Sequence, residues 1–357
     1  MKKSPAHLVL ASSGSYPRTG SAPEMLALEE TAKAFESGER TTADLVDAQN
    51  AMSRRAISEQ VAAGLDIVTD GQVRWRDPIS HIPSALDNVR LDGSHPFFAT
   101  SQKYRQPVLM GRPTRRGPLV AHEFSFACNA LGHLPTPKGK AGKLSIKPVL
   151  IGPYTLAKFS SADSAFREAS ESYSSLEHRV EAFADALAAE IKALIEAGAE
   201  LIQIDEPAAA SSPADFPLVA SGISALVAAR NSAAGGFRRA SLALYLYFGD
   251  AAPLYDQLQD LPVDILGLDF VANPKLSETV SSSGSAKTLA LGFLCGQNPD
   301  LEDPQAIARE IERLLPLLPS QRAHLGPSCG LGFLSHEAAA AKLALLPKIQ
   351  QLVLGQA

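Results

Sequence analysis

Residues 176–207 read LEHRVEAFADALAAEIKALIEAGAELIQIDEP, and this stretch decides the fold. Its first part carries apolar residues at helical spacing and ends at Gly198, which suits the left-handed cap of a helix. The apolar run 201–204 follows and ends in Asp205 and Glu206. A short apolar run with such boundaries is typical of a buried parallel strand. The stretch therefore predicts a helix, then a strand that ends in two acids.

The same unit recurs along the chain. A helix over 42–63 precedes Gly64, a strand over 65–68 and the polar end Asp70. Six more strand predictions fit the rhythm: 7–10, 146–151, 240–247, 265–270, 288–294 and 323–325. Helices fall between most of them, and two more are predicted over 304–315 and 335–352. Eight strands alternating with helices predict an α/β fold of the (β/α)8 TIM-barrel type.

One segment interrupts this rhythm between strands two and three. Residues from about 77 to 145 are rich in Pro, Gly, Arg and His and are weakly periodic. We expect an insertion in a single domain that spans 1–357, with a hairpin that pairs 107–110 with 119–124. The insertion is either a lid over the barrel mouth or a loop that contacts a partner.

Composition narrows the class of protein. The 357 residues are 45% hydrophobic and 20% charged, which supports a large core. The net charge of −5 argues against nucleic-acid binding. No window approaches the ~20 consecutive apolar residues of a membrane span. Three cysteines cannot build a disulfide framework and suit a reducing compartment, so we expect a cytoplasmic protein.

The residues that follow each predicted strand are the ones to examine for chemistry, because barrel active sites lie at the carboxyl ends of the strands. Hydroxyls, amides, carboxylates and two thiols gather there. This mixture suits a small molecule with amino and carboxylate groups. Asp205 could pair with an ammonium, while Ser15 and nearby backbone N–H groups could hold a carboxylate.

Five of these strand ends resemble the cobalamin-independent methionine synthase family, in its short single-barrel form. The matching pieces are Gly14-Ser15-Tyr16-Pro17, Asp70-Gly71-Gln72 with Arg74, and the stretches 147–155, 202–208 and 327–331. They occur in the family's order and cover nearly the whole chain except the insertion.

This resemblance implies a methyltransferase that moves a methyl group to a small thiol, most simply homocysteine to give methionine. Ser15 matches the serine that holds the substrate carboxylate, and Asp205 matches the aspartate that holds the ammonium. Gln72 stands where the family usually has a glutamate. The expected partners are a small amino acid and a methyl donor, either of the folate type or a methylated donor protein.

The resemblance also implies zinc, held by a His-x-Cys pair after strand five, a glutamate after strand six and a cysteine after strand eight. Cys329 matches the last ligand, Asp269 replaces the glutamate, and the His-x-Cys pair is absent. Cys295 ends strand seven and could complete a zinc site with Cys329 and Asp269. Alternatively, Cys295 is a small core residue and Cys329 a relic.

The remaining candidate residues have two interpretations each. Gln297 replaces the family's proton-relaying histidine, and Tyr247 ends strand five, so both are catalytic candidates beside Asp205. Trp75 could stack on a flat donor or pack against the rim. Arg18 could bind a substrate anion or make a surface ion pair. His81 and His122 lie in the insertion, where a histidine could reach the mouth or be solvated.

Two other functions fit the same sequence. The missing His-x-Cys pair is compatible with a repurposed barrel enzyme that works without zinc on another small amino-acid-like or thioether substrate. The third alternative is a barrel without catalytic activity that binds a ligand or a partner protein.

Overall fold

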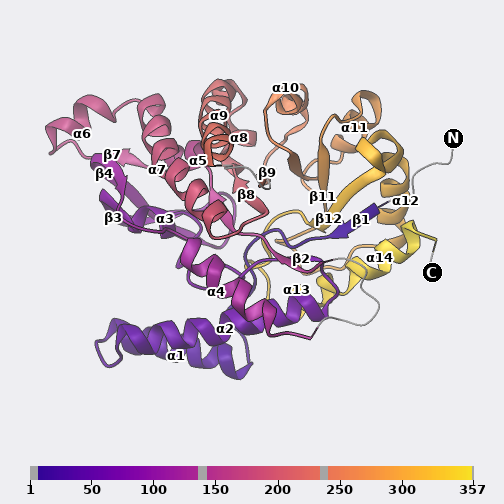
Figure 1. The fold of residues 1–357 in the computed structure, drawn as a ribbon, viewed down its shortest axis with the longest axis horizontal. Helices are drawn as coiled ribbons and strands as arrows, with labels where there is room; N and C mark the ends of the chain where they lie inside the picture. The colour runs from indigo at the N-terminus through magenta and orange to yellow at the C-terminus, as the bar shows by residue number, and fades with distance from the viewer. Residues whose placement is uncertain (1–6, 136–142, 234–239, 356–357) are drawn as a thin grey trace.

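The computed structural model describes residues 7–135, 143–233 and 240–355, and eight parallel strand positions form a closed ring (Figure 1). In ring order the strands are β1 (His7–Leu10), β2 (Ile67–Val68), β5 (Ser145–Ile146) continued by β6 (Val149–Ile151), β8 (Leu201–Asp205), β9 (Ser241–Leu246), β10 (Ile265–Asp269), β11 (Thr288–Leu294) and β12 (Arg322–Pro327). Seven of these pair in the order β1-β12-β11-β10-β9-β8-β6. The predicted (β/α)8 fold is confirmed.

The ring closes where the third strand position is interrupted. β2 pairs with β5, and an isolated bridge joins Ala11 to Ile67. Pro148 has no N–H and breaks the ladder between β5 and β6. The neighbouring groups still bond, because Lys147 N donates to the Val68 carbonyl at 2.8 Å and Gln203 N donates to the Pro148 carbonyl at 3.0 Å.

Helices surround the ring. They are α1 (Pro23–Glu36), α2 (Thr42–Ala62), α3 (His81–Ser84), α4 (Ala121–Gly132), α5 (Pro153–Lys158), α6 (Arg167–Ser172), α7 (Leu176–Glu196), α8 (Pro207–Ser211), α9 (Phe216–Ala233), α10 (Tyr255–Asp260), α11 (Leu276–Ser283), α12 (Pro304–Leu314), α13 (His336–Leu343) and α14 (Leu345–Val353). Side-chain caps begin the long ones: Thr41 and Asp44 form a capping box for α2, and Ser175 caps α7.

The insertion contains a hairpin, but its strands differ from those expected. β3 (Leu86–Pro96) pairs antiparallel with β4 (Lys103–Arg115), and β7 (Ser161–Ala162) adds to β4. The predicted pairing of 107–110 with 119–124 is wrong. β3 was missed because most of its residues are exposed or half-buried, so it carries few apolar residues.

Residues 119–121 turn away from the sheet because a distant carboxylate holds their backbone. Glu190 in α7 accepts the N–H groups of Leu119, Val120 and Ala121 at 2.8–2.9 Å and so caps the start of α4. A cap from a residue about seventy positions away is invisible to local sequence patterns.

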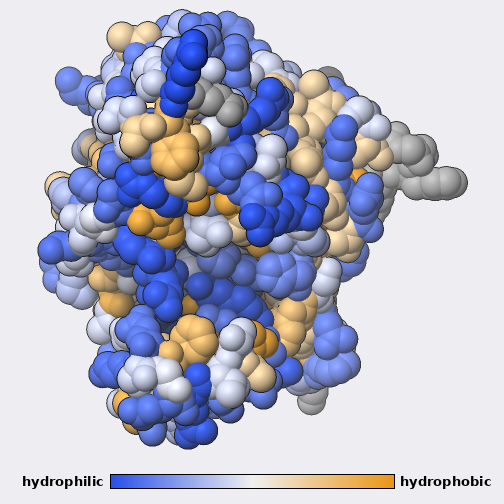
Figure 2. All heavy atoms as spheres, turned by 90° about the vertical axis from the view of Figure 1, so that its left-hand side faces the viewer, coloured by the Kyte–Doolittle hydropathy of each residue, from blue (hydrophilic) through white to orange (hydrophobic). Residues whose placement is uncertain are grey.

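The side of the molecule that carries β3 and β4 is mostly hydrophilic (Figure 2). Its apolar atoms form small separate clusters, so this view shows no broad apolar face. Among the described residues, no helix has both the length and the apolar character that crossing a membrane requires.

Candidate active site

A pocket of about 310 Å³ opens at the carboxyl ends of the barrel strands. Six residues singled out from the sequence line it together: Ser15, Arg18, Gln72, Trp75, Asp205 and Tyr247. They come from the end of β8 and from the loops after β1, β2 and β9, which the ring brings to one rim. Examining the residues at the carboxyl ends of the strands therefore located a polar pocket.

Asp205 is the carboxylate at the inner end of this pocket. Gln203 donates to its Oδ1 at 2.6 Å, and the Tyr247 hydroxyl donates to its Oδ2 at 3.1 Å. Burial raises the pKa of Asp205 to about 7, against the stabilising effects of Gln203 and Lys147. A carboxylate poised in this way can pair with a substrate cation near neutral pH.

Lys147 lies inside the barrel near Asp205. Its ammonium group is fully buried and donates to the Ser12 carbonyl at 2.7 Å and to the Tyr245 hydroxyl at 3.2 Å. Burial lowers the pKa of Lys147 to about 7, although the charge of Asp205 opposes this change. Lys147 and Gln203 were missed as site residues because they precede the strand ends that were examined.

Glu206 points to the other side of β8, as alternate residues of a strand do. Its carboxylate accepts the N–H groups of Tyr154 and Thr155 at 2.9 and 2.7 Å. A Cβ at Gly152 would come within 2.2 Å of Glu206, so only glycine fits there. Glu206 therefore fixes the loop after β6 and leaves Asp205 to face the pocket.

Ser15 projects from the loop after β1 against the loop after β12. Gly332 N donates to its hydroxyl at 3.2 Å, and Leu331 N donates to its carbonyl at 2.7 Å. A Cβ at Gly330 would lie 2.3 Å from the Ser15 hydroxyl oxygen. The glycine keeps space around a hydroxyl that retains its own proton to donate to a carboxylate.

The outer end of the pocket is basic. Arg18 donates to the carbonyls of Trp75 and Arg76 and so shapes their loop, while Arg76 and Lys103 line the rim. Asp77 also lines the pocket, and its carboxylate accepts the N–H groups of Ile79 and Ser80, so the three basic side chains there outnumber one acidic side chain. The rim thus suits an anionic group.

The hairpin tip covers part of the pocket and supplies residues that sequence reasoning missed. Phe97, Gln102 and Lys103 line the pocket from the β3–β4 turn. Gln102 donates to the Gly332 carbonyl at 3.2 Å, which ties the hairpin to the loop after β12. The adjacent Phe97 and Phe98 stand in a polar stretch of the sequence. They could have indicated that this segment packs against another part of the protein, because such rings are seldom left in solvent.

The comparisons with known proteins agree with this geometry. Residues 11–351 match the family described as "Cobalamin-independent synthase, Catalytic domain". The chain belongs to this family. The family resemblance predicted from the sequence is confirmed.

Relatives of the same family extend over almost the whole chain. The methionine synthase of Saccharolobus solfataricus is 29% identical over 331 residues, 92% of this chain and 90% of the relative. That of Methanothermobacter marburgensis is 27% identical, covering 94% and 96%. The structure of a B12-independent methionine synthase from Shewanella sp. W3-18-1 with selenomethionine aligns with a TM-score of 0.71, 20% identity and 98% coverage of both chains, which supports the fold.

Cobalamin-independent methionine synthases generally depend on zinc, but the predicted ligands do not assemble here. Asp269 is committed to its own loop, because its Oδ1 accepts Val271 N at 3.0 Å and Ala272 N at 2.8 Å. Burial, followed by the charge of Asp269, raises the pKa of the Cys329 thiol well above its ordinary value. No group of three metal-binding side chains occurs within residues 7–135, 143–233 and 240–355.

The remaining predicted residues do not line the pocket, although Cys329 packs in one cluster with Tyr247, which does. Cys329 is buried among barrel residues that include Tyr245 and Ala290, and Cys295 is half-buried; neither lines the pocket. Gln297 is exposed and also lies outside the pocket lining. The donor set that the structure presents therefore does not fit a catalytic zinc ion, which needs three protein ligands.

Proposed function

We propose that this protein is a methyltransferase that converts homocysteine to methionine. One observation carries the proposal: Ser15, Gln72 and Asp205 line one pocket in a chain that belongs to the cobalamin-independent synthase family. The methionine synthases of Saccharolobus and Methanothermobacter support it, since each aligns over at least 90% of its length.

The inner end of the pocket orients the amino-acid acceptor. The Ser15 hydroxyl donates to the substrate carboxylate, and Asp205 accepts the substrate ammonium. Tyr247 and Gln203 keep the Asp205 carboxylate oriented and favour its ionised form. Gln72 adds a neutral amide where a second carboxylate would have attracted the ammonium more strongly. Holding the thiol in line with the methyl group supplies much of the rate.

The outer part of the pocket favours a small methyl donor of the folate type over a donor protein. Trp75 and Phe97 form apolar parts of its wall, although little of either ring is exposed, and Arg76 and Lys103 also line the pocket and could attract a carboxylate tail. The hairpin tip reaches over this space and is tied by Gln102 to Gly332. A flat molecule with an anionic end fits such a pocket.

The proposed reaction is not routed through zinc, because Asp269, Cys295 and Cys329 do not form a three-ligand group among the described residues. Thiol activation then depends on pH, since a free thiol is only a few per cent ionised at pH 7. We expect protein purified without chelator to hold far less than one zinc per chain. We also expect Cys329→Ser to leave its metal content unchanged. Stoichiometric zinc that this substitution removes would contradict the assignment.

The direct test is methionine formation by the purified chain from homocysteine with methyltetrahydrofolate, and separately with methylcobalamin. Methionine should form with the wild type and fall by about 10- to 100-fold in kcat/KM for homocysteine in Asp205→Asn, which removes a charge-assisted contact. Homocysteine binding without methionine from either donor would contradict methyl transfer. It would favour the second candidate, a zinc-free barrel enzyme with another amino-acid-like substrate, which the missing ligand set supports.

A further inference from the structure

The two groups proposed to hold the acceptor stand on different strands of the ring. Asp205, the ammonium anchor, ends β8, whereas Ser15, the carboxylate anchor, lies in the loop after β1. These strands do not pair with each other, because β2 and the third strand position stand between them. A direct link between the two anchors must therefore cross the barrel interior.

Gln203 makes such a link. It lies in β8 two residues before Asp205, so both side chains point to the same face of the strand. Its Nε2 donates to Asp205 Oδ1 at 2.6 Å and to the Ser13 carbonyl at 3.0 Å. Asp205 and Ser13 both line the pocket, whereas Gln203 is fully buried and does not line it.

The Ser13 carbonyl can accept this bond because a glycine follows it. Gly14 has a φ of +135°, in a region that residues with side chains rarely adopt. The next residue, Ser15, then meets the loop after β12, where Gly332 N donates to its hydroxyl at 3.2 Å. The bond from Gln203 thus ends two residues from the carboxylate anchor, and a shift at Ser13 moves Ser15 with it.

The other carbonyls of this segment are held from other parts of the ring. Lys147 donates to the Ser12 carbonyl at 2.7 Å, Thr69 donates to that of Gly14 at 2.6 Å, and Leu331 N donates to that of Ser15 at 2.7 Å. Of the four donors, Gln203 alone also bonds to Asp205. It is therefore the donor that joins this segment to the ammonium anchor.

The carbonyl end of the Gln203 amide is unpaired. Its Oε1 is buried, and no group in the described part of the chain donates to it. A buried acceptor without a partner lowers stability. A glutamine kept for stability would satisfy both ends of its amide, whereas here only the N–H donors are paired. Such an imbalance is expected of a side chain that serves a functional site.

We propose that Gln203 is a positioning residue that holds the ammonium anchor and the carboxylate anchor at one fixed separation. This inference rests on the proposed function. A pocket held in this way selects acceptors that carry both groups on one carbon, which is the α-amino-acid class. Gln203 touches neither group of the acceptor and acts through Asp205 and residues 13–15.

Two truncated ligands separate the anchors. Methionine carries both groups, methylthiopropylamine carries only the ammonium, and γ-methylthiobutyrate carries only the carboxylate. Asp205→Asn should weaken only ligands with the ammonium, and Ser15→Ala only ligands with the carboxylate. Gln203→Met keeps the volume and removes both donors. It should therefore raise the Kd of both truncated ligands, each by about 3- to 10-fold.

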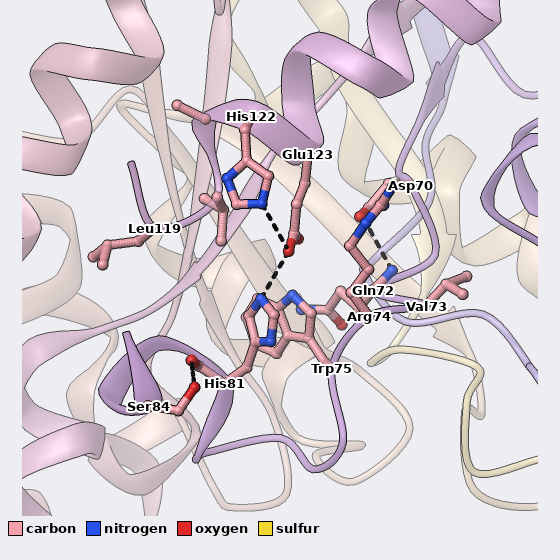
Figure 3. A network of polar contacts seen from close by, with 12 residues as sticks. Asp70, Gln72, Val73, Arg74, Trp75, His81, Ser84, Leu119, His122 and Glu123 are labelled. Carbon is pink, nitrogen blue, oxygen red and sulfur yellow. Dashed lines mark hydrogen bonds and ion pairs between the residues drawn. The ribbon is translucent and has the colours of Figure 1, made fainter. Parts of the chain in front are cut away.

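The single tryptophan measures this binding without turnover. Trp75 lines the pocket, and His81 stacks on its ring with centroids 4.9 Å apart and an interplanar angle of 16° (Figure 3). His81 Nε2 lies 2.9 Å from Glu123 Oε1, which holds the stack in place. These contacts do not involve Gln203. The change in Trp75 fluorescence during titration at pH 8 therefore gives the Kd of each ligand in each variant.

Gln259→Met is the matched control. The Gln259 side-chain oxygen accepts Ser285 Oγ and Ala286 N ahead of β11, outside the pocket lining. This variant should leave all three Kd values unchanged. Normal binding of γ-methylthiobutyrate by Gln203→Met would overturn the proposal, because Gln203 would then act on Asp205 alone.

A second variant keeps the test open if Gln203→Met does not fold. Gln203→Glu keeps the length, and its carboxyl binds a proton beside Asp205 because two adjacent carboxylates do not both ionise. A neutral carboxyl has one O–H donor, so it can bond to Asp205 or to Ser13 but not to both. We expect one truncated ligand to bind as in wild type and the other to bind more weakly. Normal binding of both would overturn the proposal.

The same titrations distinguish this inference from the proposed function. Wild-type protein that binds none of the three ligands would overturn the proposed function, and the role of Gln203 with it. Wild-type protein that binds methionine but forms none from either donor would overturn methyl transfer alone. The Kd values of the Gln203 variants would still decide whether Gln203 joins the two anchors.

Discussion

At the scale of single residues, Asp205 governs how the acceptor binds. Its pKa of about 7 means that the ionised form, which pairs with an ammonium, is lost as the pH falls through neutrality. Tyr247→Phe removes a donor to that ionised form, so the pKa of Asp205 should rise further. We expect the acidic limb of kcat/KM for homocysteine to move up by about one pH unit.

Tyr154→Phe is the matched control, because the Tyr154 hydroxyl donates to Asp215 and lies outside the pocket lining. The acidic limb of its kcat/KM profile should coincide with that of wild type. If the acidic limb of Tyr247→Phe stays in place or moves to lower pH, Tyr247 does not act on the Asp205 carboxylate.

The sequence predicted which residues share the rim better than it predicted where their side chains point. Ser15, Gln72 and Asp205 follow strands whose order the (β/α)8 pattern fixes, so their meeting could be foreseen. Asp269 and Cys329 also lie at strand ends, those of β10 and β12, yet Asp269 turns to cap its own loop and Cys329 packs into the barrel interior. Side-chain direction depends on local loop geometry, which strand counting does not contain.

At the scale of elements, the β3–β4 hairpin acts as a cover that one side-chain contact ties down. Gln102→Ala removes the hydrogen bond to the Gly332 carbonyl and leaves the strands paired. We expect KM for the methyl donor to rise about 3- to 10-fold, in keeping with the loss of about 1 kcal/mol, with little change in KM for homocysteine.

Gln106→Ala changes the same residue type within β4, outside the pocket lining, and should leave both KM values unchanged. Equal donor KM values in the two variants would mean that the tip does not help to hold the donor.

The sequence predicted a hairpin in this segment but not which residues pair. About half of the β3 residues are exposed to solvent, so the strand carries few apolar residues. Glu190 in the distant helix α7 holds the backbone of residues 119–121.

At the scale of the whole molecule, the buried Asp205 of the acceptor site lowers the free energy of unfolding. Asp205 titrates at about 7 when folded, against about 3.9 in an unfolded chain, so the folded protein binds more protons between these values. Its contribution to the free energy of unfolding therefore falls as the pH rises through this window. Lys147 changes in the opposite sense above pH 7, because burial lowers its pKa to about 7 from an ordinary value of about 10.4.

Asp205→Asn should therefore stabilise the fold at pH 8 while it weakens acceptor binding. We expect a gain of about 1–3 kcal/mol at pH 8, below the full effect of the pKa shift, because Asn loses the charge-assisted bonds to Gln203 and Tyr247. The gain should vanish near pH 4, where the wild-type carboxyl is neutral in the folded protein. Denaturant unfolding at the two pH values measures it, with Asp47→Asn on an exposed helix face as the matched control. A variant less stable than wild type at pH 8 would show that the buried charge is fully compensated.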